Sequence, residues 1–468
     1  MRLPPVLKNH GFIELSNRGA AADCPNIGGW SSPTTLTTIP NPTPTLLKET
    51  PMLNLLTNSG AGRPTARPHP AVDKQIKQRT PLPMSILGVG ALLAALATSV
   101  LIAEPANAAT TVTLEDRVLS ITGDAASNSL SVGRTPDGVI TLNGTIVLNG
   151  QATVGNVDII GMDGGEGNDT LRIDETNGSM PAAKLVGGIG NDRITGGSGD
   201  DIIDGGEGAD SIDGGAGADR IDGGAGNDKV VGGPGNDIVD LGADSDVFTW
   251  KTGEGNDAKV DGADGTDTLR VIGSDGVDGV NAFTNFNDES EGLISLFQVP
   301  GTTETMRFLG FEELKIDVQG GADLVRVEDL STVGMQVVRV NTDPSRGDDG
   351  QRDSVQVSGK LFRPNQIRIK GTPSTGVTAV LGTTSVTFKG AEALTVFGGV
   401  GPDIVDASRL AAGTLDLTEN LDGGIAGDIL IGSPGNDTLR GGNGDDRIEC
   451  RGGVDVVDAG LGNNTVIC

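Results

Sequence analysis

A nine-residue repeat constrains this chain more than any other feature of its sequence. From Gly187 to Thr249 the sequence divides without a gap into seven nonamers, and a second block of such units runs from Gly423 to Ile467. Both blocks follow the pattern G-G-x-G-x-D-x-U-x, in which U is apolar. A flexible glycine-rich linker is the alternative, but a linker has no reason to keep position eight apolar. In the first block position eight is occupied by Ile194, Ile203, Ile212, Ile221, Val230, Val239 and Phe248.

The residue types within one unit predict how it folds. Glycines at positions one, two and four permit positive φ, so the backbone can coil tightly and turn its carbonyl groups inward. Aspartate at position six adds a carboxylate, and Ca²⁺ prefers about six to eight such oxygens at about 2.3–2.6 Å. The last three residues are expected to form a short strand with its apolar centre pointing inward. Two units then make one coil of 18 residues, with turns on alternate edges.

These units resemble the repeats-in-toxin (RTX) family of calcium-binding nonapeptide repeats, over 108 residues in strict register. The resemblance implies an all-β fold, a parallel β-roll or β-solenoid built from calcium-binding nonapeptide repeats, with flanking β-rich modules. It also implies several bound Ca²⁺ ions, each between repeats n and n+2. The metal ligands implied are Asp192, Asp201, Asp210, Asp219, Asp228, Asp237, Asp246, Asp428, Asp437, Asp446 and Asp455.

The same spacing, carried over from the family, pairs these aspartates across one coil. The implied pairs are Asp192–Asp210, Asp201–Asp219, Asp210–Asp228, Asp219–Asp237, Asp228–Asp246, Asp428–Asp446 and Asp437–Asp455. Departures from the pattern weaken the expectation at two of the units. The last unit has Asn464 at position six, and the seventh has Leu241 at position one and Ala243-Asp244 in its turn. The sites expected at these two units are therefore weaker.

The charge of the repeats predicts a calcium-dependent fold. Residues 187–249 contain 14 acidic and three basic side chains, a net charge of −11. Without cations these charges repel one another, and one apolar residue per unit offsets little of the conformational entropy. We therefore expect a largely disordered calcium-free state and an affinity of about 10⁻⁴–10⁻³ M, as in other extracellular modules. The whole chain carries a net charge of −29, which makes nucleic acid an improbable partner.

The region before the repeats predicts export. Residues 1–83 hold 13 of the 23 prolines and are expected to be a disordered extension, or not to be translated at all. Residues 84–108 are expected to be a signal peptide, with an apolar run from Ile86 to Ala103 and an A-x-A site at 106–108. A membrane anchor is the alternative, since 18 apolar residues can just span a bilayer. Cleavage would leave a secreted, extracellular chain with no membrane span, and association with the cell surface is the alternative location.

The remaining segments predict further β-structure. Residues 109–186 form an expected N-terminal β module, 187–249 a first roll, 250–422 β-rich middle modules with degenerate repeats, and 423–468 a second roll with a C-terminal cap. The degenerate units place Asp169, Asp267, Asp323 and Asp403 at position six. The sequence leaves open whether the middle continues the solenoid or forms separate modules.

Two cysteines at the end of the chain predict a disulfide. Cys450 and Cys468 are one coil apart and both fall at position one of a unit. Stacked strands lie about 4.8 Å apart, within the Cα separation that a disulfide accepts, and export favours oxidation. We expect a Cys450–Cys468 bridge that fastens the last coil.

Catalysis is not expected. Both histidines, His10 and His69, lie before the predicted cleavage site, which excludes a Ser-His-Asp triad, a Cys-His pair and an H-E-x-x-H zinc site in the exported chain. The first interpretation is therefore a calcium-binding protein with a structural or binding role. The alternatives are a calcium-rigidified adhesin or matrix protein with a cell-surface or matrix ligand and, less favoured, a glycan-active enzyme that uses paired carboxylates.

Overall fold

The fold was examined in a computed structural model of the chain. It describes residues 100–103, 109–285, 288–298, 303–342, 351–360, 362–415 and 419–468. Contacts divide the chain into Met1–Gly90 and Ala91–Cys468, and all described residues belong to the second unit. The predicted extension at 1–83 and most of the predicted signal peptide lie outside the described residues. The last four residues of the apolar run form strand β1, Val100–Ala103, which pairs antiparallel with β2, Ala109–Glu115.

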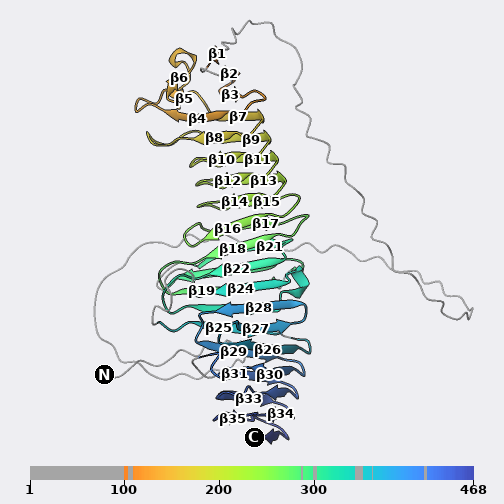
Figure 1. The fold of residues 1–468 in the computed structure, drawn as a ribbon. Coiled ribbons are helices and arrows are strands. Elements are labelled where there is room, and N and C mark those ends of the chain that lie inside the picture. Colours follow the sequence, from red (N-terminus) through yellow and green to blue (C-terminus); the bar gives the residue numbers. More distant parts are fainter. Residues whose placement is uncertain are drawn as a thin grey trace, which may run out of the picture. The chain divides into compact units, whose positions relative to one another are not determined.

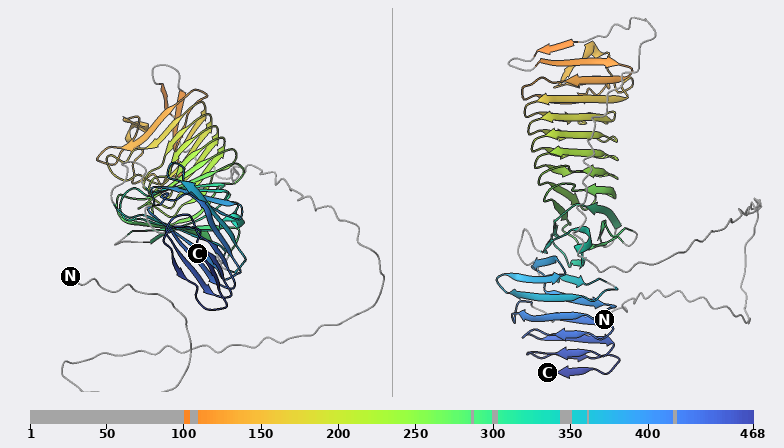
Figure 2. Two further views of the ribbon diagram at one scale, coloured as in Figure 1. Left: turned by 60° about the horizontal axis from the view of Figure 1, so that its bottom comes forward. Right: turned by 90° about the vertical axis from the view of Figure 1, so that its right-hand side faces the viewer.

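The described residues of the second unit form two sheets of 18 strands each. Figures 1 and 2 show how these strands are stacked. In order of pairing, the first sheet contains β1, β2, β3 (Val118–Thr122), β7 (Ile159–Glu166), β9 (Ala183–Ile189), β11 (Ile202–Glu207), β13 (Arg220–Ala225), β15 (Ile238–Asp240), β17 (Asp257–Asp261), β21 (Thr303–Leu309), β20 (Gly292–Gln298), β19 (Asp278–Thr284), β23 (Leu324–Glu328), β25 (Ser354–Ser358), β29 (Ala393–Gly399), β31 (Glu419–Ile425), β33 (Asp437–Asn443) and β35 (Val456–Asp458).

The second sheet follows the same course. It contains β6 (Thr145–Ile146), β5 (Ile140–Leu142), β4 (Ser129–Arg134), β8 (Thr170–Ile173), β10 (Arg193–Thr195), β12 (Ser211–Asp213), β14 (Lys229–Val231), β16 (Val247–Lys251), β18 (Thr268–Ile272), β22 (Glu313–Asp317), β24 (Val337–Asn341), β28 (Thr384–Lys389), β27 (Gly376–Leu381), β26 (Gln366–Thr372), β30 (Ile404–Leu410), β32 (Ile429–Ile431), β34 (Arg447–Glu449) and β36 (Thr465–Ile467).

The repeats set the pairing of the first block. Strands alternate between the two sheets, and each pairs in parallel with the strand 18 residues on, as Ile194 does with Ile212 and Ile203 with Ile221. All seven position-eight side chains of this block are at most 2% exposed, as the register predicted. The core therefore lies between the sheets, with one large apolar residue from each unit. The predicted all-β solenoid is confirmed.

The same two sheets continue through the middle of the chain. Two antiparallel insertions interrupt the stacking, β19-β20-β21 in the first sheet and β26-β27-β28 in the second, and parallel pairing resumes after each. Strands here bury two apolar residues rather than one, such as Val325 and Val327 in β23. The middle residues thus have a thicker core than the repeat blocks. Among the described residues no helix has the length and apolar character needed to cross a membrane.

Candidate metal sites

The position-six aspartates lie in the turns that precede the strands, stacked coil upon coil. In each case the backbone N–H of one aspartate donates a hydrogen bond to Oδ1 of the aspartate one coil further on. All seven pairs implied by the sequence are joined in this way. They are Asp192–Asp210 (2.7 Å), Asp201–Asp219 (2.8 Å), Asp210–Asp228 (2.8 Å), Asp219–Asp237 (2.8 Å), Asp228–Asp246 (2.7 Å), Asp428–Asp446 (2.9 Å) and Asp437–Asp455 (3.0 Å).

The other carboxylate oxygen, Oδ2, is buried without a hydrogen-bond partner in most of these turns. Leaving a buried polar atom unsatisfied costs about 1–3 kcal/mol, and more for a charged group. A column of such atoms is therefore a candidate site for a cation. The aspartates concerned are at most 3% exposed, and they are Asp169, Asp192, Asp210, Asp219, Asp228, Asp237, Asp246, Asp267, Asp403, Asp428 and Asp446.

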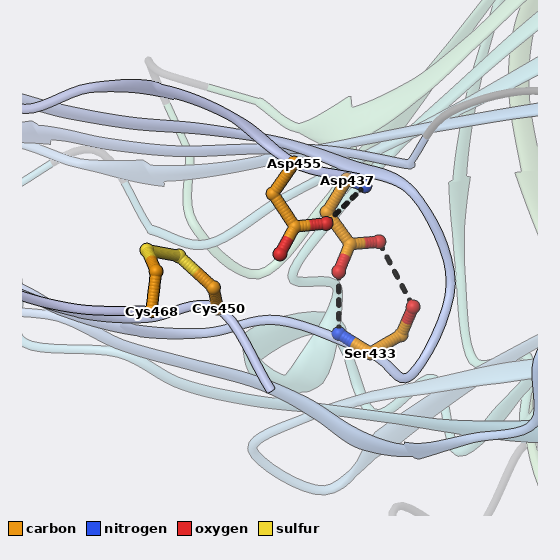
Figure 3. The surroundings of a disulfide bond; sticks show 5 residues. All are labelled: Ser433, Asp437, Cys450, Asp455 and Cys468. Carbon is orange, nitrogen blue, oxygen red and sulfur yellow. Dashed lines mark hydrogen bonds between the residues drawn. A yellow bond between two sulfur atoms is a disulfide. The ribbon is translucent and has the colours of Figure 1, made fainter. Parts of the chain in front are cut away.

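Two turns satisfy this oxygen from the protein itself. Oδ2 of Asp201 accepts a hydrogen bond from the backbone N–H of Gly197 at 2.8 Å. Oδ2 of Asp437 accepts one from the N–H of Ser433 at 2.7 Å, and the Ser433 hydroxyl donates to Oδ1 of the same residue at 2.9 Å (Figure 3). Ser433 stands where most units have their second glycine. These two turns therefore have less need of a cation than the others.

Position-one glycines form the wall of most candidate sites. A Cβ built on Gly423 would lie 2.6 Å from Asp428 Oδ2 and 2.8 Å from the carbonyl oxygen of Gly441, one coil on. On Gly398 it would lie 2.7 Å from Asp403 Oδ2 and 2.5 Å from the carbonyl oxygen of Gly423. A carboxylate oxygen and a carbonyl oxygen thus face the space that a side chain would fill. This is an oxygen-lined cradle that only glycine leaves open.

The expectation of positive φ at position one was wrong. Positive φ occurs at positions two and four, as in Gly206 (φ +103°) and Gly208 (φ +138°), but at none of the position-one glycines of the first block. At position one it is the close approach of the neighbouring coil that excludes a side chain. Glycine is therefore required there for space rather than for backbone conformation.

Burial strongly perturbs the titration of these carboxyls. Desolvation raises the pKa of Asp219, Asp228 and Asp246 to about 7, and that of Asp192 and Asp237 to about 6. Like charges on neighbouring aspartates add to the effect for Asp192, Asp219, Asp228 and Asp246. At neutral pH, ionising these aspartates in the folded chain therefore costs free energy when no cation is bound.

Acidification is expected to stabilise the calcium-free fold. Because the pKa of Asp219 rises from 3.8 to about 7 on folding, its contribution to stability is fully present below about pH 3.8 and is lost as pH rises through about 7. The charged groups facing it are Asp200, Asp201 and Asp237, all acidic. Circular dichroism of calcium-free protein should therefore show more β-structure at pH 5 than at pH 8. An equal or weaker β signal at pH 5, in samples shown by light scattering to be unaggregated, would contradict this.

The donor set suits a hard cation that takes oxygen ligands. In the described part of the chain no three His, Cys, Asp or Glu side chains converge as a metal cluster would require. Carboxylates from successive coils must therefore be supplemented by backbone carbonyl oxygens. Ca²⁺ accepts this mixture, whereas zinc and copper favour nitrogen and sulfur.

The structure extends the aspartate columns beyond the sequence-predicted ligands. Asp237 donates its N–H to Oδ1 of Asp257 at 3.3 Å, and burial raises the pKa of Asp257 to about 8. The nine-residue frame missed Asp257 because two extra residues shift its unit, although the local sequence GEGND preserves the pattern. Asp169 and Asp403 also join the columns, donating to Asp192 (2.7 Å) and Asp428 (2.8 Å).

Other carboxylates and one amide also take part in these columns. Asp267 donates its N–H to Oε2 of Glu312 at 2.9 Å, and Asp323 receives a hydrogen bond from the N–H of Asp278 at 2.8 Å. Asp446 donates to Oδ1 of Asn464 at 2.8 Å, so the last unit keeps the geometry without the charge. The sequence offered no signal for Glu312, which lies far from its partner along the chain.

Cys450 and Cys468 are paired as a disulfide one coil apart, with their Cα atoms 4.8 Å apart (Figure 3). Cys450 is 3% exposed, whereas Cys468 is exposed at the end of the second sheet. The sulfur atoms thus connect the last two strands of that sheet, β34 and β36, which also pair in parallel.

Comparison with known proteins identifies the repeats. A model of the RTX calcium-binding nonapeptide repeat matches in four copies, at residues 186–221, 213–248, 422–449 and 431–466. No curated protein matches the chain. The matched residues are those whose aspartates form the regular 18-residue columns. Both repeat blocks of this chain are therefore similar to the RTX calcium-binding nonapeptide repeat.

Proposed function

We propose that this chain is a secreted calcium-binding repeat protein that folds on binding Ca²⁺ outside the cell and has a structural or binding role, without catalytic activity. The observation that carries the proposal is the column of buried Oδ2 atoms without partners in the repeat turns. The family match supports calcium as the cation. Bound calcium supplies positive charge, and every other element of the site is provided by the chain.

The residues of the turns have separate tasks in this proposal. Position-six carboxylates, such as that of Asp219, and the carbonyl oxygens of the next coil hold the ion. The backbone N–H of the preceding aspartate orients each carboxylate through Oδ1, which leaves Oδ2 directed at the cradle. Because each aspartate belongs to two successive pairs, binding is expected to propagate along the stack.

The energetics of the repeats support extracellular folding. Residues 187–249 carry a net charge of −11 with one large apolar residue per unit, so the calcium-free form is poorly stabilised. An affinity of about 10⁻⁴–10⁻³ M would keep the repeats empty at cytosolic calcium and filled outside the cell. The apolar run before residue 104 and the paired cysteines support the same location.

Calorimetric titration of the full chain, with the bound ions counted, tests this function. Asp219→Asn is expected to lower the number of ions by one or two, because the amide keeps the hydrogen bond to Asp201 but loses the charge shared by two pairs. Asp213→Asn is the matched control, since Asp213 is exposed on β12, outside the columns. Equal ion counts for the wild type and Asp219→Asn, or no calcium binding by the wild type, would refute the proposal.

The Cys450–Cys468 bridge is expected to form in the exported protein and to stabilise the last coil. Closing a loop of 18 residues stabilises by about 3 kcal/mol. Peptide mapping without reductant should recover the linked pair. In Cys468→Ser, hydrogen exchange should accelerate in β35 and β36 but not in β10 to β14. Finding both thiols free in the secreted protein would contradict the prediction.

A further inference from the structure

A groove of about 680 Å³ lies on the first sheet, across the middle of the chain. It spans β19, β23, β25, β29 and β31, which are consecutive in that sheet through parallel pairings. Most of its lining residues are the i and i+2 positions of these strands, which share the face opposite the core. The volume lies within the range of small-molecule and oligosaccharide sites.

Two glycines account for the hollow. Gly399 of β29 pairs in register with Gly424 of β31, so this part of the face carries no side chains. Phe397 and Asp422, two residues earlier on the same strands, are also partners in register and form one side of the hollow. A ligand could therefore approach the backbone at one end of the groove and contact long side chains at the other.

A row of polar groups is already held in place across three strands. Arg326 of β23 donates from Nε to Oε1 of Gln356 on β25 at 2.7 Å, and from a terminal nitrogen to Oδ1 of Asn281 on β19 at 3.3 Å. The three residues are partners in register. Amide and guanidinium groups thus present both donors and acceptors in a fixed arrangement.

A second row combines aromatic rings with polar groups. Glu328, Ser358, Phe397 and Asp422 occupy successive strands in register, and Phe283 lines the groove on β19. Phe397 is 39% exposed. Desolvation raises the pKa of Glu328 and of Asp422, so both carboxyls are partly withdrawn from water although no stacked aspartate column requires them.

We propose that this groove binds a neutral polysaccharide that runs across the strands. Sugar hydroxyls match closely spaced amides, carboxylates and a guanidinium, and the apolar face of a pyranose can stack on an exposed phenylalanine ring. The strands repeat about every 4.8 Å, close to the length of one sugar unit. This inference goes beyond the calcium function and assigns the chain a ligand of its own.

Other ligand classes fit the groove less well. Phosphates and acidic polysaccharides would meet two carboxylates, Glu328 and Asp422, and one guanidinium, Arg326. An extended peptide that adds a strand needs a free sheet edge, whereas the groove lies on a face whose strands are paired on both sides. A neutral sugar chain is not repelled by the two carboxylates and needs no free sheet edge.

The register also indicates binding rather than hydrolysis at this groove. Glu328 and Asp422 are three strands apart in the sheet, a separation of about 14 Å at about 4.8 Å per strand. The carboxyl pairs of glycosidases lie about 5–9.5 Å apart. These two carboxyls are therefore expected to hold hydroxyl groups rather than to act as an acid and a nucleophile.

Calorimetry of the full chain in calcium with cellohexaose, mannohexaose and chitohexaose tests the proposal. At least one of these neutral hexasaccharides should bind, and Phe397→Ala should weaken that binding about tenfold or more, whereas Phe397→Trp should preserve it. Ile238→Ala is the control, because Ile238 is 43% exposed on β15 of the same sheet but outside the groove. Its affinity should equal that of the wild type.

Three results would overturn the proposal: no binding of any of the three sugars, unchanged affinity in Phe397→Ala, or tighter binding of hexagalacturonate than of the neutral sugars. Circular dichroism in the same buffer shows whether each protein is folded. A chain that fails to fold in calcium contradicts the calcium function, whereas a folded chain that binds no sugar contradicts only this inference.

Discussion

Chelation of calcium is expected to unfold the repeat blocks, residues 187–249 and 423–467, while the strands between them keep their hydrogen bonds. Each buried Oδ2 left unpaired costs about 1–3 kcal/mol, so a column of them approaches the whole stability of a typical domain, about 5–15 kcal/mol. The repeat strands bury one large apolar residue each and cannot offset this cost. Middle strands such as β22 and β23 bury two apolar residues each.

Two measurements follow this unfolding. The β-sheet signal in circular dichroism should fall on chelation and return with excess calcium. Hydrogen exchange should then be rapid in β10, β12 and β14 but slow in β22 to β25, which serve as an internal control. Mg²⁺ should not restore the signal, because it demands octahedral geometry and loses water reluctantly. Full protection of β10 to β14 in chelator would show that calcium is not needed for the fold.

Gly423→Ala is expected to abolish the calcium site of its turn and to destabilise the second block by about 1–3 kcal/mol. The added methyl group would lie 2.6 Å from Asp428 Oδ2 and 2.8 Å from the carbonyl oxygen of Gly441. The Asp428 carboxylate is held through Oδ1 by the N–H of Asp403, and Gly441 belongs to β33, which pairs with β31. Neither atom can therefore retreat without breaking the register. The methyl group would also occupy the space that the cation needs.

The matched control is Gly161→Ala in β7 of the same sheet. Its Cβ would lie 3.8 Å from the nearest atom, the carbonyl oxygen of Leu119, which is an ordinary contact. This variant should bind as many ions as the wild type and keep its stability, or gain about 0.4–1 kcal/mol through the less flexible unfolded chain. Equal ion counts and equal stability of Gly423→Ala and Gly161→Ala would show that the space beside the position-one glycine is not needed for calcium binding.

The periodic part of the fold could be predicted because each repeat unit has the same spacing of glycine, aspartate and apolar residues. Spacing placed Ile203 over Ile221, since a nine-residue unit returns to the same edge every second turn. The resemblance to the RTX family implied that Asp219 lies beside Asp201. The irregular units were harder. Two extra residues shift Asp257 out of the nine-residue register. Glu312 lies 45 positions along the chain from its partner Asp267.

The sequence by itself determined the repeat, its apolar position eight and the aspartates that stack, because local spacing decides which residues share an edge. Only the tertiary structure decided that the middle strands belong to the same two sheets and that glycine is needed at position one for space. It also decided that Phe397 lies beside Asp422, next to the paired glycines Gly399 and Gly424. These features depend on which coil packs against which. Insertions of variable length, such as β19-β20-β21, set that pairing, and they leave no period in the sequence.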